Sequence, residues 1–252
     1  MRIKPLLIIL PVVVLLLAMF ILDKPIEHKE AGGGTMTLNL VTGQLGDIKN
    51  DPGAPVFEAC DTSSANIGEL QYNCCVLASD EKCEDGWIAV ELPDGLGHCR
   101  TGFVQEKNAV REELTISTKD GLRWSIVNDS LSHLGLKFVQ YGTSLETGID
   151  CSYFLNRIFA DNGVMIPDTP NEIRDAGKLI TMEEAEPGDI VFYAENEGYG
   201  HVGLYLGGGY QLNCSGHSGK VYPQGGVRIT KVHYRDRETP YFYRILDEEV
   251  QQ

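Results

Sequence analysis

The pattern of hydrophobic and polar residues begins with one long apolar run at the N-terminus. Residues 6–22 carry no charge and follow the basic residues Arg2 and Lys4. As a helix, these seventeen residues would span about 25 Å, which is at the short end of the range for a membrane helix. The sequence therefore predicts an N-terminal membrane helix within residues 1–24, with its basic end in the cytoplasm and the rest of the chain exported.

A cleaved signal peptide is the alternative interpretation of this segment. Signal peptidase needs small residues before the cut, and the run ends in A-M-F-I-L at 18–22, which is a poor site. We expect an uncleaved, single-pass anchor in the cell membrane with an extracytoplasmic catalytic domain, and secretion after cleavage as the alternative. Residues 25–37 then form a linker, made flexible by the three consecutive glycines at 32–34.

From residue 38 to residue 111 the chain reads as short extended segments separated by turn residues. Residues 86–92 alternate between apolar and polar, P-D-G at 93–95 is a turn, and residues 101–104 resume an extended run. This pattern predicts a small β-barrel domain over 38–111. Another kind of small β domain, held together by disulfides, is the alternative.

The remainder of the chain mixes helices with strands. Cys151 begins an apolar stripe with i, i+3, i+4, i+7, i+8 spacing, which predicts a helix over 151–162 ended by Asn162-Gly163. An earlier helix is expected over 124–136. Because the helices precede the strands, residues 112–252 are predicted to form an α+β domain. The predicted strands cover residues 189–194, 201–206, 210–214 and 226–230.

Charge excludes one class of partner. The 252-residue chain has a net charge of −15, whereas binding the phosphate backbone of a nucleic acid requires clustered Lys and Arg. We therefore expect no nucleic acid partner.

The seven cysteines fit an exported protein in an oxidising compartment. Five of them crowd together, and we expect one or two disulfides within this group. Zinc is the competing interpretation, but neither a C-x2-C pair nor a nearby pair of histidines supplies tetrahedral spacing. We expect no metal and no cofactor. The clustered residues are Cys60, Cys74, Cys75, Cys83 and Cys99.

Cys151 is a candidate nucleophile because it follows Asp150 at the start of the predicted helix. The backbone N–H groups and the positive end of the helix dipole at this point favour a thiolate. The alternative is a structural cysteine, since Cys151 also lies on the apolar stripe. Cys214 is expected to be a small buried residue, with a redox partnership with Cys151 as the alternative.

His201 is the candidate base, at the start of a predicted strand. A three-residue loop at 207–209 would pair Leu206 with Tyr210 and place Asn213 diagonal to His201 on the same face. A two-residue loop would move Asn213 to the other face. In the first register Asn213 can accept a hydrogen bond from one ring nitrogen of His201, which leaves the other to take the thiol proton.

Three motifs occur in the order and spacing of one family. They are D-C-S at 150–152, P-G-D-I-V-F at 187–192 and H-V-G-L-Y-L-G at 201–207. Over residues 125–246 the chain resembles the NlpC-type papain-like cell-wall peptidases, which read D-C-S-G, then P-G-D-(aliphatic)-(aliphatic)-F, then H-V-(G/A)-(aliphatic)-Y-(aliphatic)-G. Asp189, within the second motif, is expected to be architectural.

The resemblance implies a papain-like fold with Cys151 as nucleophile, His201 as general base and Asn213 as the third polar residue. It implies hydrolysis of a peptide bond in the peptidoglycan stem peptide, commonly between D-Glu and a diamino acid, through a thioester. The stem peptides of peptidoglycan are therefore the expected partner.

The resemblance also implies that Asp150 and Ser152 bind the stem peptide, Asp150 by receiving a free amino group. Two departures from the family pattern lie near the expected cleft. The Gly after D-C-S is Tyr153 here, and the family's upstream Y-x-W-G-G reads F-V-Q-Y-G, beginning at Phe138. Tyr153 and Phe138 are added to the expected substrate-binding residues.

Residues 38–111 resemble the bacterial SH3-like modules found beside wall hydrolases. The late strands of those modules often read G-W-x-x-V and then T-G-(aromatic)-V, as residues 86–90 and 101–104 do here. The resemblance implies a module that positions the wall or narrows the cleft.

Two other functions fit the same sequence. One is a wall amidase, or another papain-like acyl-transfer enzyme, and the other is an inactive wall-binding protein on the same fold. The predicted anchor favours action near the cell's own membrane, including work beside a cell-envelope or export apparatus.

Overall fold

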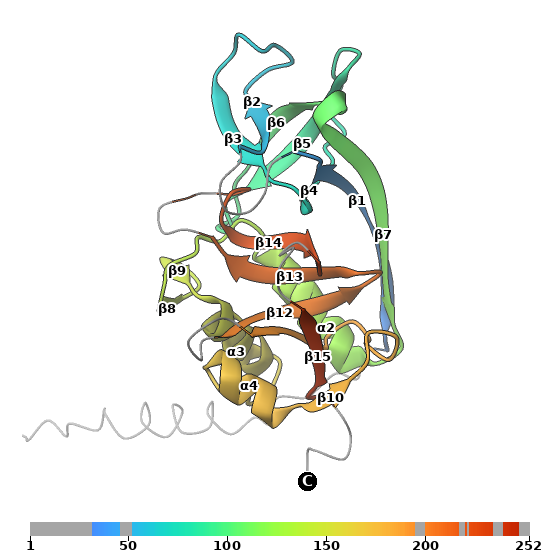
Figure 1. Ribbon diagram of the computed structural model, residues 1–252, viewed down its shortest axis with the longest axis vertical. Coiled ribbons are helices and arrows are strands. Elements are labelled where there is room, and N and C mark those ends of the chain that lie inside the picture. The colour runs from blue at the N-terminus through green and yellow to red at the C-terminus, as the bar shows by residue number, and fades with distance from the viewer. Residues whose placement is uncertain are drawn as a thin grey trace, which may run out of the picture. The chain divides into compact units, whose positions relative to one another are not determined.

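Two long strands, β1 (Gly34–Gly43) and β7 (Ala109–Thr118), pair antiparallel over their whole length in the computed structural model (Figure 1). The structure describes residues 32–45, 52–194, 200–216, 220, 222–233 and 239–246.

The start of β1 corrects the predicted linker over 25–37, because residues 34–37 are strand. A side chain at Gly34 would place Cβ 2.2 Å from the ring of Trp124, so this glycine allows close packing and does not provide flexibility. The remainder of the predicted linker to residue 31, and the whole predicted membrane segment 1–24, lie outside the described residues. Among the described residues, no helix has the length and apolar character to cross a membrane.

Strands β1 and β7 belong to a nine-stranded sheet in the order β10-β15-β11-β12-β13-β14-β4-β1-β7, with every pair antiparallel. The predicted boundary between residues 111 and 112 falls inside β7, so the two predicted domains share one sheet. The join is made where β14 pairs with β4, with Ile229 opposite Cys75 and Thr230 opposite Cys74. The remaining strands are β4 (Cys74–Leu77), β10 (Lys178–Ile180), β11 (Ile190–Ala194), β12 (Gly200–Gly207), β13 (Tyr210–Ser215), β14 (Gly226–Lys231) and β15 (Pro240–Arg244).

A second, four-stranded sheet in the order β3-β2-β6-β5 accounts for most of the other extended segments between residues 38 and 111. Its side chains form a second hydrophobic core together with side chains of β1 and β4 from the large sheet, and the later residue Tyr222 also contributes. A disulfide joins Cys60 to Cys83, which confirms one predicted bridge within the cysteine cluster. The elements are β2 (Ala54–Phe57), β3 (Asn66–Leu70), β5 (Trp87–Pro93), β6 (Cys99–Gln105), the 3-10 helix η1 (Glu106–Asn108), and the separate pair β8 (Thr143–Ser144) and β9 (Gly148–Ile149).

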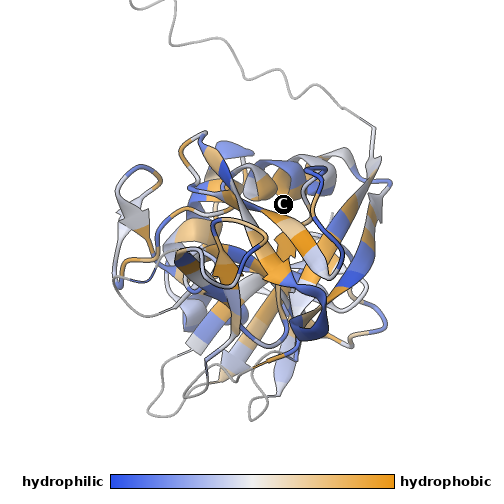
Figure 2. Ribbon diagram, turned by 90° about the horizontal axis from the view of Figure 1, so that it is seen from above, coloured by the Kyte–Doolittle hydropathy of each residue, from blue (hydrophilic) through white to orange (hydrophobic). Residues whose placement is uncertain are grey.

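Three helices complete the described structure: α2 (Gly121–Ser132), α3 (Cys151–Asp161) and α4 (Pro170–Ala176). The apolar faces of α2 and α3 pack into the largest core, together with side chains of β7, β12 and β13. Figure 2 shows hydrophobic residues concentrated on the central strands and helices. Helices together with antiparallel strands agree with the predicted α+β class, and α3 confirms the predicted helix to within one residue. Helix α2 starts earlier than predicted because Asp120 caps it.

Asp189 lies immediately before β11 and is fully buried. Its carboxylate holds three parts of the fold together. Its carboxylate accepts hydrogen bonds from Arg123 of α2 at 2.9 Å, from Arg244 of β15 at 2.9 Å and from the backbone N–H of Glu186 at 2.8 Å. Arg123 also donates to the backbone carbonyl of Leu246 at 3.2 Å. The expectation that Asp189 is architectural is confirmed.

Candidate active site

The start of α3 places Cys151 at the first helical residue behind a capping carboxylate. Asp150 is the N-cap, and its Oδ1 accepts a hydrogen bond from the backbone N–H of Tyr153 at 2.9 Å. The Ser152 hydroxyl donates to the same oxygen at 3.3 Å. The cap holds the first turn of the helix in place, and Cys151 is partly exposed at its end.

The side chain of Asp150 is half-buried at the start of α3. Burial raises the pKa of Asp150 above its usual value, although these hydrogen bonds act in the opposite direction. In this structure the carboxylate therefore caps the helix through its bonds to Tyr153 and Ser152.

Strands β12 and β13 pair in the predicted register, but the loop between them differs from the predicted one. Gly207 pairs with Tyr210, so the loop has two residues, and the predicted pairing of Leu206 with Tyr210 is wrong. A bulge between Tyr205 and Gly207 adds one residue to β12, and Leu204 then pairs with Leu212 as the predicted register requires. The bulge cancels the change of face that a two-residue loop would otherwise cause.

This register puts Asn213 on the face of the sheet that carries His201. A side chain at Gly203 would place Cβ 3.1 Å from Cβ of Asn213, so these positions share a face. Alternation places His201 on that same face, and its ring centroid lies 6.0 Å from that of Tyr193. The aliphatic residues of β12 face the opposite core, as predicted. His201 and Asn213 are both buried.

The side chain of Asn213 is fixed by its own hydrogen bonds. Its Nδ2 donates to Thr230 Oγ1 at 2.9 Å, and its Oδ1 accepts from Ser215 Oγ at 2.6 Å. Buried Arg228 donates to Ser215 Oγ at 3.0 Å, so the Ser215 proton is directed at Asn213. An amide oxygen has two lone pairs, and the second can accept from an imidazole.

The start of α3 contacts the hairpin through Cys214. The thiol of Cys214 donates to the backbone carbonyl of Ile149 at 3.2 Å, two residues before Cys151. Helix α3 packs on β12 and β13 through the large core. The structure thus brings the helix that carries Cys151 against the two strands that carry His201 and Asn213, whereas the pairing of the Cys151 thiol with His201 stays a prediction.

Comparison with known proteins identifies the family of this part of the chain. Residues 135–246 match the NlpC/P60 family. This segment is an NlpC/P60 domain.

Curated relatives of the NlpC/P60 domain are peptidases by name. The gamma-D-glutamyl-L-lysine dipeptidyl-peptidase of Bacillus subtilis (strain 168) is 37% identical over 114 residues, covering 44% of this chain and 37% of that protein. The peptidoglycan endopeptidase RipB of Mycobacterium tuberculosis is 43% identical over 108 residues, covering 38% of this chain and 44% of that protein. The chain thus spans less than half the length of either relative.

Solved structures include similar domains. The P60 domain of an antigen from M. avium subspecies paratuberculosis is 29% identical, with a TM-score of 0.43, and the match covers 50% of this chain and 96% of that chain.

The remaining predicted site residues of the NlpC/P60 domain lie around the helix start. Ser152 is buried, whereas Tyr153 is partly exposed and a hydrogen bond to the carboxylate of Asp168 raises its pKa. Phe138 forms an isolated bridge to Ile149 and packs against the large core, so it supports the segment before Cys151 from behind.

Sequence reasoning missed two features of the NlpC/P60 domain. One is the buried group of Arg228, Ser215 and Thr230 behind Asn213, which comes from strand alternation in β13 and β14 and has no local motif. The other is Tyr141, which is 73% exposed and has a positive φ of 59°. The signal for Tyr141 was its position in F-V-Q-Y-G, where the family pattern has Gly.

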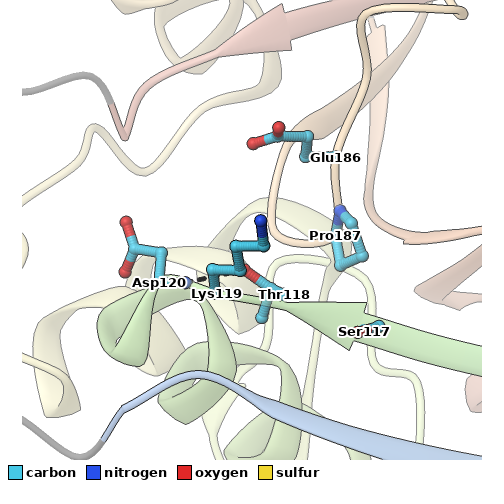
Figure 3. Close-up of a pocket in the computed structure, with 6 residues that line it drawn as sticks. All are labelled: Ser117, Thr118, Lys119, Asp120, Glu186 and Pro187. Carbon is cyan, nitrogen blue, oxygen red and sulfur yellow. Dashed lines mark hydrogen bonds between the residues drawn. The ribbon is translucent and has the colours of Figure 1, made fainter.

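A separate pocket of about 390 Å³ lies where β7 meets α2 (Figure 3). The side chains of Lys119 and Glu186 lie on facing sides of it. None of the predicted site residues lines this pocket, and we assign it no role. Among the described residues, no cluster of His, Cys, Asp or Glu is arranged to hold a metal ion. The lining residues are Ser117, Thr118, Lys119, Asp120, Glu186 and Pro187.

The two cysteines of the NlpC/P60 domain are expected to differ in their reaction with iodoacetamide at neutral pH. Cys151 is partly exposed at a helix start, whereas burial raises the pKa of Cys214 well above its usual value. Because the thiolate is the reacting form, Cys151 should be alkylated at least about tenfold faster than Cys214. Peptide mapping by mass spectrometry over a time course measures both rates. Equal rates in the folded protein would contradict the expectation.

Proposed function

We propose that this protein is a cysteine peptidase that hydrolyses a peptide bond in the stem peptide of peptidoglycan. The observation that carries the proposal is Cys151 at the capped start of α3 within an NlpC/P60 domain. Peptidase names among the curated relatives support the reaction class. The proposed bond joins D-Glu to a diamino acid.

In the proposed mechanism the Cys151 thiolate attacks the amide carbonyl and forms a tetrahedral intermediate. Backbone N–H groups at the start of α3 stabilise the oxyanion. His201, protonated by the thiol, gives its proton to the leaving amine, and the carbon–nitrogen bond breaks to leave a thioester. His201 then takes a proton from water, which attacks the thioester and releases the acid and the thiol.

Asn213 is proposed to orient His201 in this mechanism. Its Oδ1 already accepts from Ser215, and its second lone pair would accept the ring N–H of His201 that faces away from the thiol. Arg228 and Thr230 hold the amide in that orientation through the bonds described above. Ser152 and Tyr153 are proposed to shape the substrate side of the site, and Phe138 is proposed to support the segment before Cys151.

The other parts of the chain have proposed roles as well. We infer that the β segments between residues 38 and 111 are an SH3-like module beside a papain-like peptidase. The first 24 residues are proposed to anchor the protein in the cell membrane, with the peptidase outside the cytoplasm. Such an anchored enzyme would act on nearby wall, including wall beside a cell-envelope or export apparatus.

Digestion of purified peptidoglycan followed by mass spectrometry of the soluble products tests the proposed bond. We expect fragments that end in D-Glu, together with new amino termini on the diamino acid. Release of intact stem peptides from lactyl groups on the sugar would favour the amidase alternative instead. Binding to the wall without any product would favour the inactive wall-binding protein.

A further inference from the structure

Gln211 of β13 is a fully buried amide to which the mechanism above gives no role. It stands two residues before Asn213 on the same strand, so strand alternation places both side chains on the face of the sheet that carries His201. Strands β12, β13 and β14 lie side by side (Figure 1). A polar side chain at such a position must find its hydrogen-bond partners within the protein.

The amide nitrogen of Gln211 joins two side chains that support the proposed site. Its Nε2 donates to Tyr193 Oη at 2.7 Å and to Thr230 Oγ1 at 3.3 Å. Tyr193 lies opposite His201 in the pairing of β11 with β12, and the centroids of their rings are 6.0 Å apart. Thr230 Oγ1 also accepts from Asn213 Nδ2 at 2.9 Å. One amide group therefore connects the support of the His201 ring with the support of Asn213.

The hydroxyl proton of Tyr193 determines how the Gln211 amide is oriented. Tyr193 Oη donates this proton to the backbone carbonyl of Val232, so it can only accept from Gln211. The amide NH₂ group therefore faces Tyr193, and the amide oxygen faces Gly203. A side chain at Gly203 would place Cβ 2.6 Å from Gln211 Oε1, so the glycine at this position of β12 leaves room for the amide.

Stability alone does not account for an amide at position 211. Gln211 Oε1 is buried and has no hydrogen-bond partner among the residues that the structure describes, which is unfavourable for folding. Without Gln211, Tyr193 would keep its bond to Val232, and Thr230 would keep its bond to Asn213. An apolar side chain of the same length would therefore fit here with little or no loss of stability.

We propose that Gln211 is a positioning residue of the peptidase, whose amide holds Tyr193 and Thr230 in place and thereby fixes the ring of His201 relative to Asn213. This inference rests on the proposed function and adds a residue to its mechanism. In that mechanism one ring nitrogen of His201 exchanges protons, and the other is oriented by Asn213. A small displacement of the ring would lengthen both hydrogen bonds, and reaction rates fall steeply with such misplacement.

Gln211→Met tests the inference, because methionine keeps the length of the side chain and removes the amide. With the full chain and soluble peptidoglycan fragments as substrate, kcat is expected to fall about tenfold while KM stays within about twofold. Alkylation of Cys151 by iodoacetamide at neutral pH should slow by at least about threefold, because the thiolate depends on a correctly placed His201. The unfolding midpoint should stay the same or rise.

Two further variants make the result specific. Tyr193→Phe keeps the ring beside His201 and removes the hydroxyl, so it should also lower kcat. Combined with Gln211→Met, it should lower kcat no further than Gln211→Met alone, because the two side chains act through one hydrogen bond. Gln105→Met is the matched control, since Gln105 ends β6 and its side chain makes no capping bond to the following 3-10 helix. The control should change neither kcat nor the alkylation rate.

Three outcomes would contradict these expectations in different ways. If Gln211→Met kept both kcat and the alkylation rate, Gln211 would not position the site. If the losses of Gln211→Met and Tyr193→Phe multiplied in the double variant, the two side chains would act independently, which also overturns the inference. If the unmodified chain released no product from the fragments, the proposed function itself would fail, and the alkylation rates would decide separately whether Gln211 supports Cys151.

Discussion

Cys151→Ala is expected to lower the rate of peptidoglycan digestion by at least about a thousandfold, because removing the nucleophile of a covalent mechanism leaves only the contribution of binding and the oxyanion site. The substitution removes one sulfur atom from a partly exposed position, so the fold should persist. Release of soluble stem fragments from purified wall, followed by mass spectrometry, measures the loss. A circular dichroism spectrum and an unfolding midpoint that match those of the unmodified chain would show that the variant is folded.

Cys99→Ala is the matched control, because Cys99 is an exposed cysteine of β6 outside the proposed site. It should digest the wall at the unmodified rate. If Cys151→Ala digested the wall as fast as the unmodified chain, the cysteine peptidase proposal would be wrong. A thioester-trapping experiment on Cys151→Ala should likewise yield no acyl-enzyme.

Asp189→Ala is expected to lower the free energy of unfolding by about 3–5 kcal/mol, because it leaves two arginines without their carboxylate in or near the interior. The exposed fractions of the Arg123 and Arg244 side chains are 4% and 19%, so water replaces the lost partner poorly. Urea unfolding followed by tryptophan fluorescence measures the change. Asp189→Asn can still accept hydrogen bonds, so it should lower the free energy of unfolding by less than Asp189→Ala does.

The control for this prediction is Arg157→Ala on α3. Arg157 and Asp161 form an ion pair at 3.0 Å with side chains that are 58% and 40% exposed. Exposed ion pairs contribute little to stability, so the free energy of unfolding should change by less than about 0.5 kcal/mol. If Asp189→Ala lowered the free energy of unfolding by less than about 1 kcal/mol, Asp189 would not be what holds α2, β15 and the turn before β11 together.

Elements with a strong local pattern could be predicted from the sequence. Helix α3 has an apolar stripe, a capping Asp150 and a stop at Asn162, and these signals agree with one another. The register of the β12–β13 hairpin was predicted correctly, although the predicted three-residue loop was wrong. Three consecutive glycines fit both a three-residue loop and a two-residue loop with a bulge, and composition does not distinguish them.

The joining of the two halves could not be predicted. Strand β14 pairs with β4 between residues more than 150 positions apart, at Ile229 and Cys75, and no local pattern encodes such a pairing. Trp124 likewise packs on Gly34, so a glycine run that looks like a linker begins a strand.

The candidate site could be predicted only in part. Cys151 and His201 could be proposed as site residues because their motifs are local and ordered, and Asn213 was proposed from the register of the β12–β13 hairpin. The positive φ of Tyr141 could not be predicted, because this residue stands at the third position of a four-residue turn, where the family pattern has glycine. Backbone conformation at that position is invisible to a pattern of hydrophobic and polar residues.

The shared sheet has a consequence for cooperativity. Thr230, which holds the amide of Asn213, sits on β14 and is paired across the strands with Cys74 of β4. Separation of β4 from the sheet would leave β14 as an exposed edge and loosen the strand behind Asn213. We therefore expect that opening of the N-terminal strands also loosens the proposed catalytic side chains.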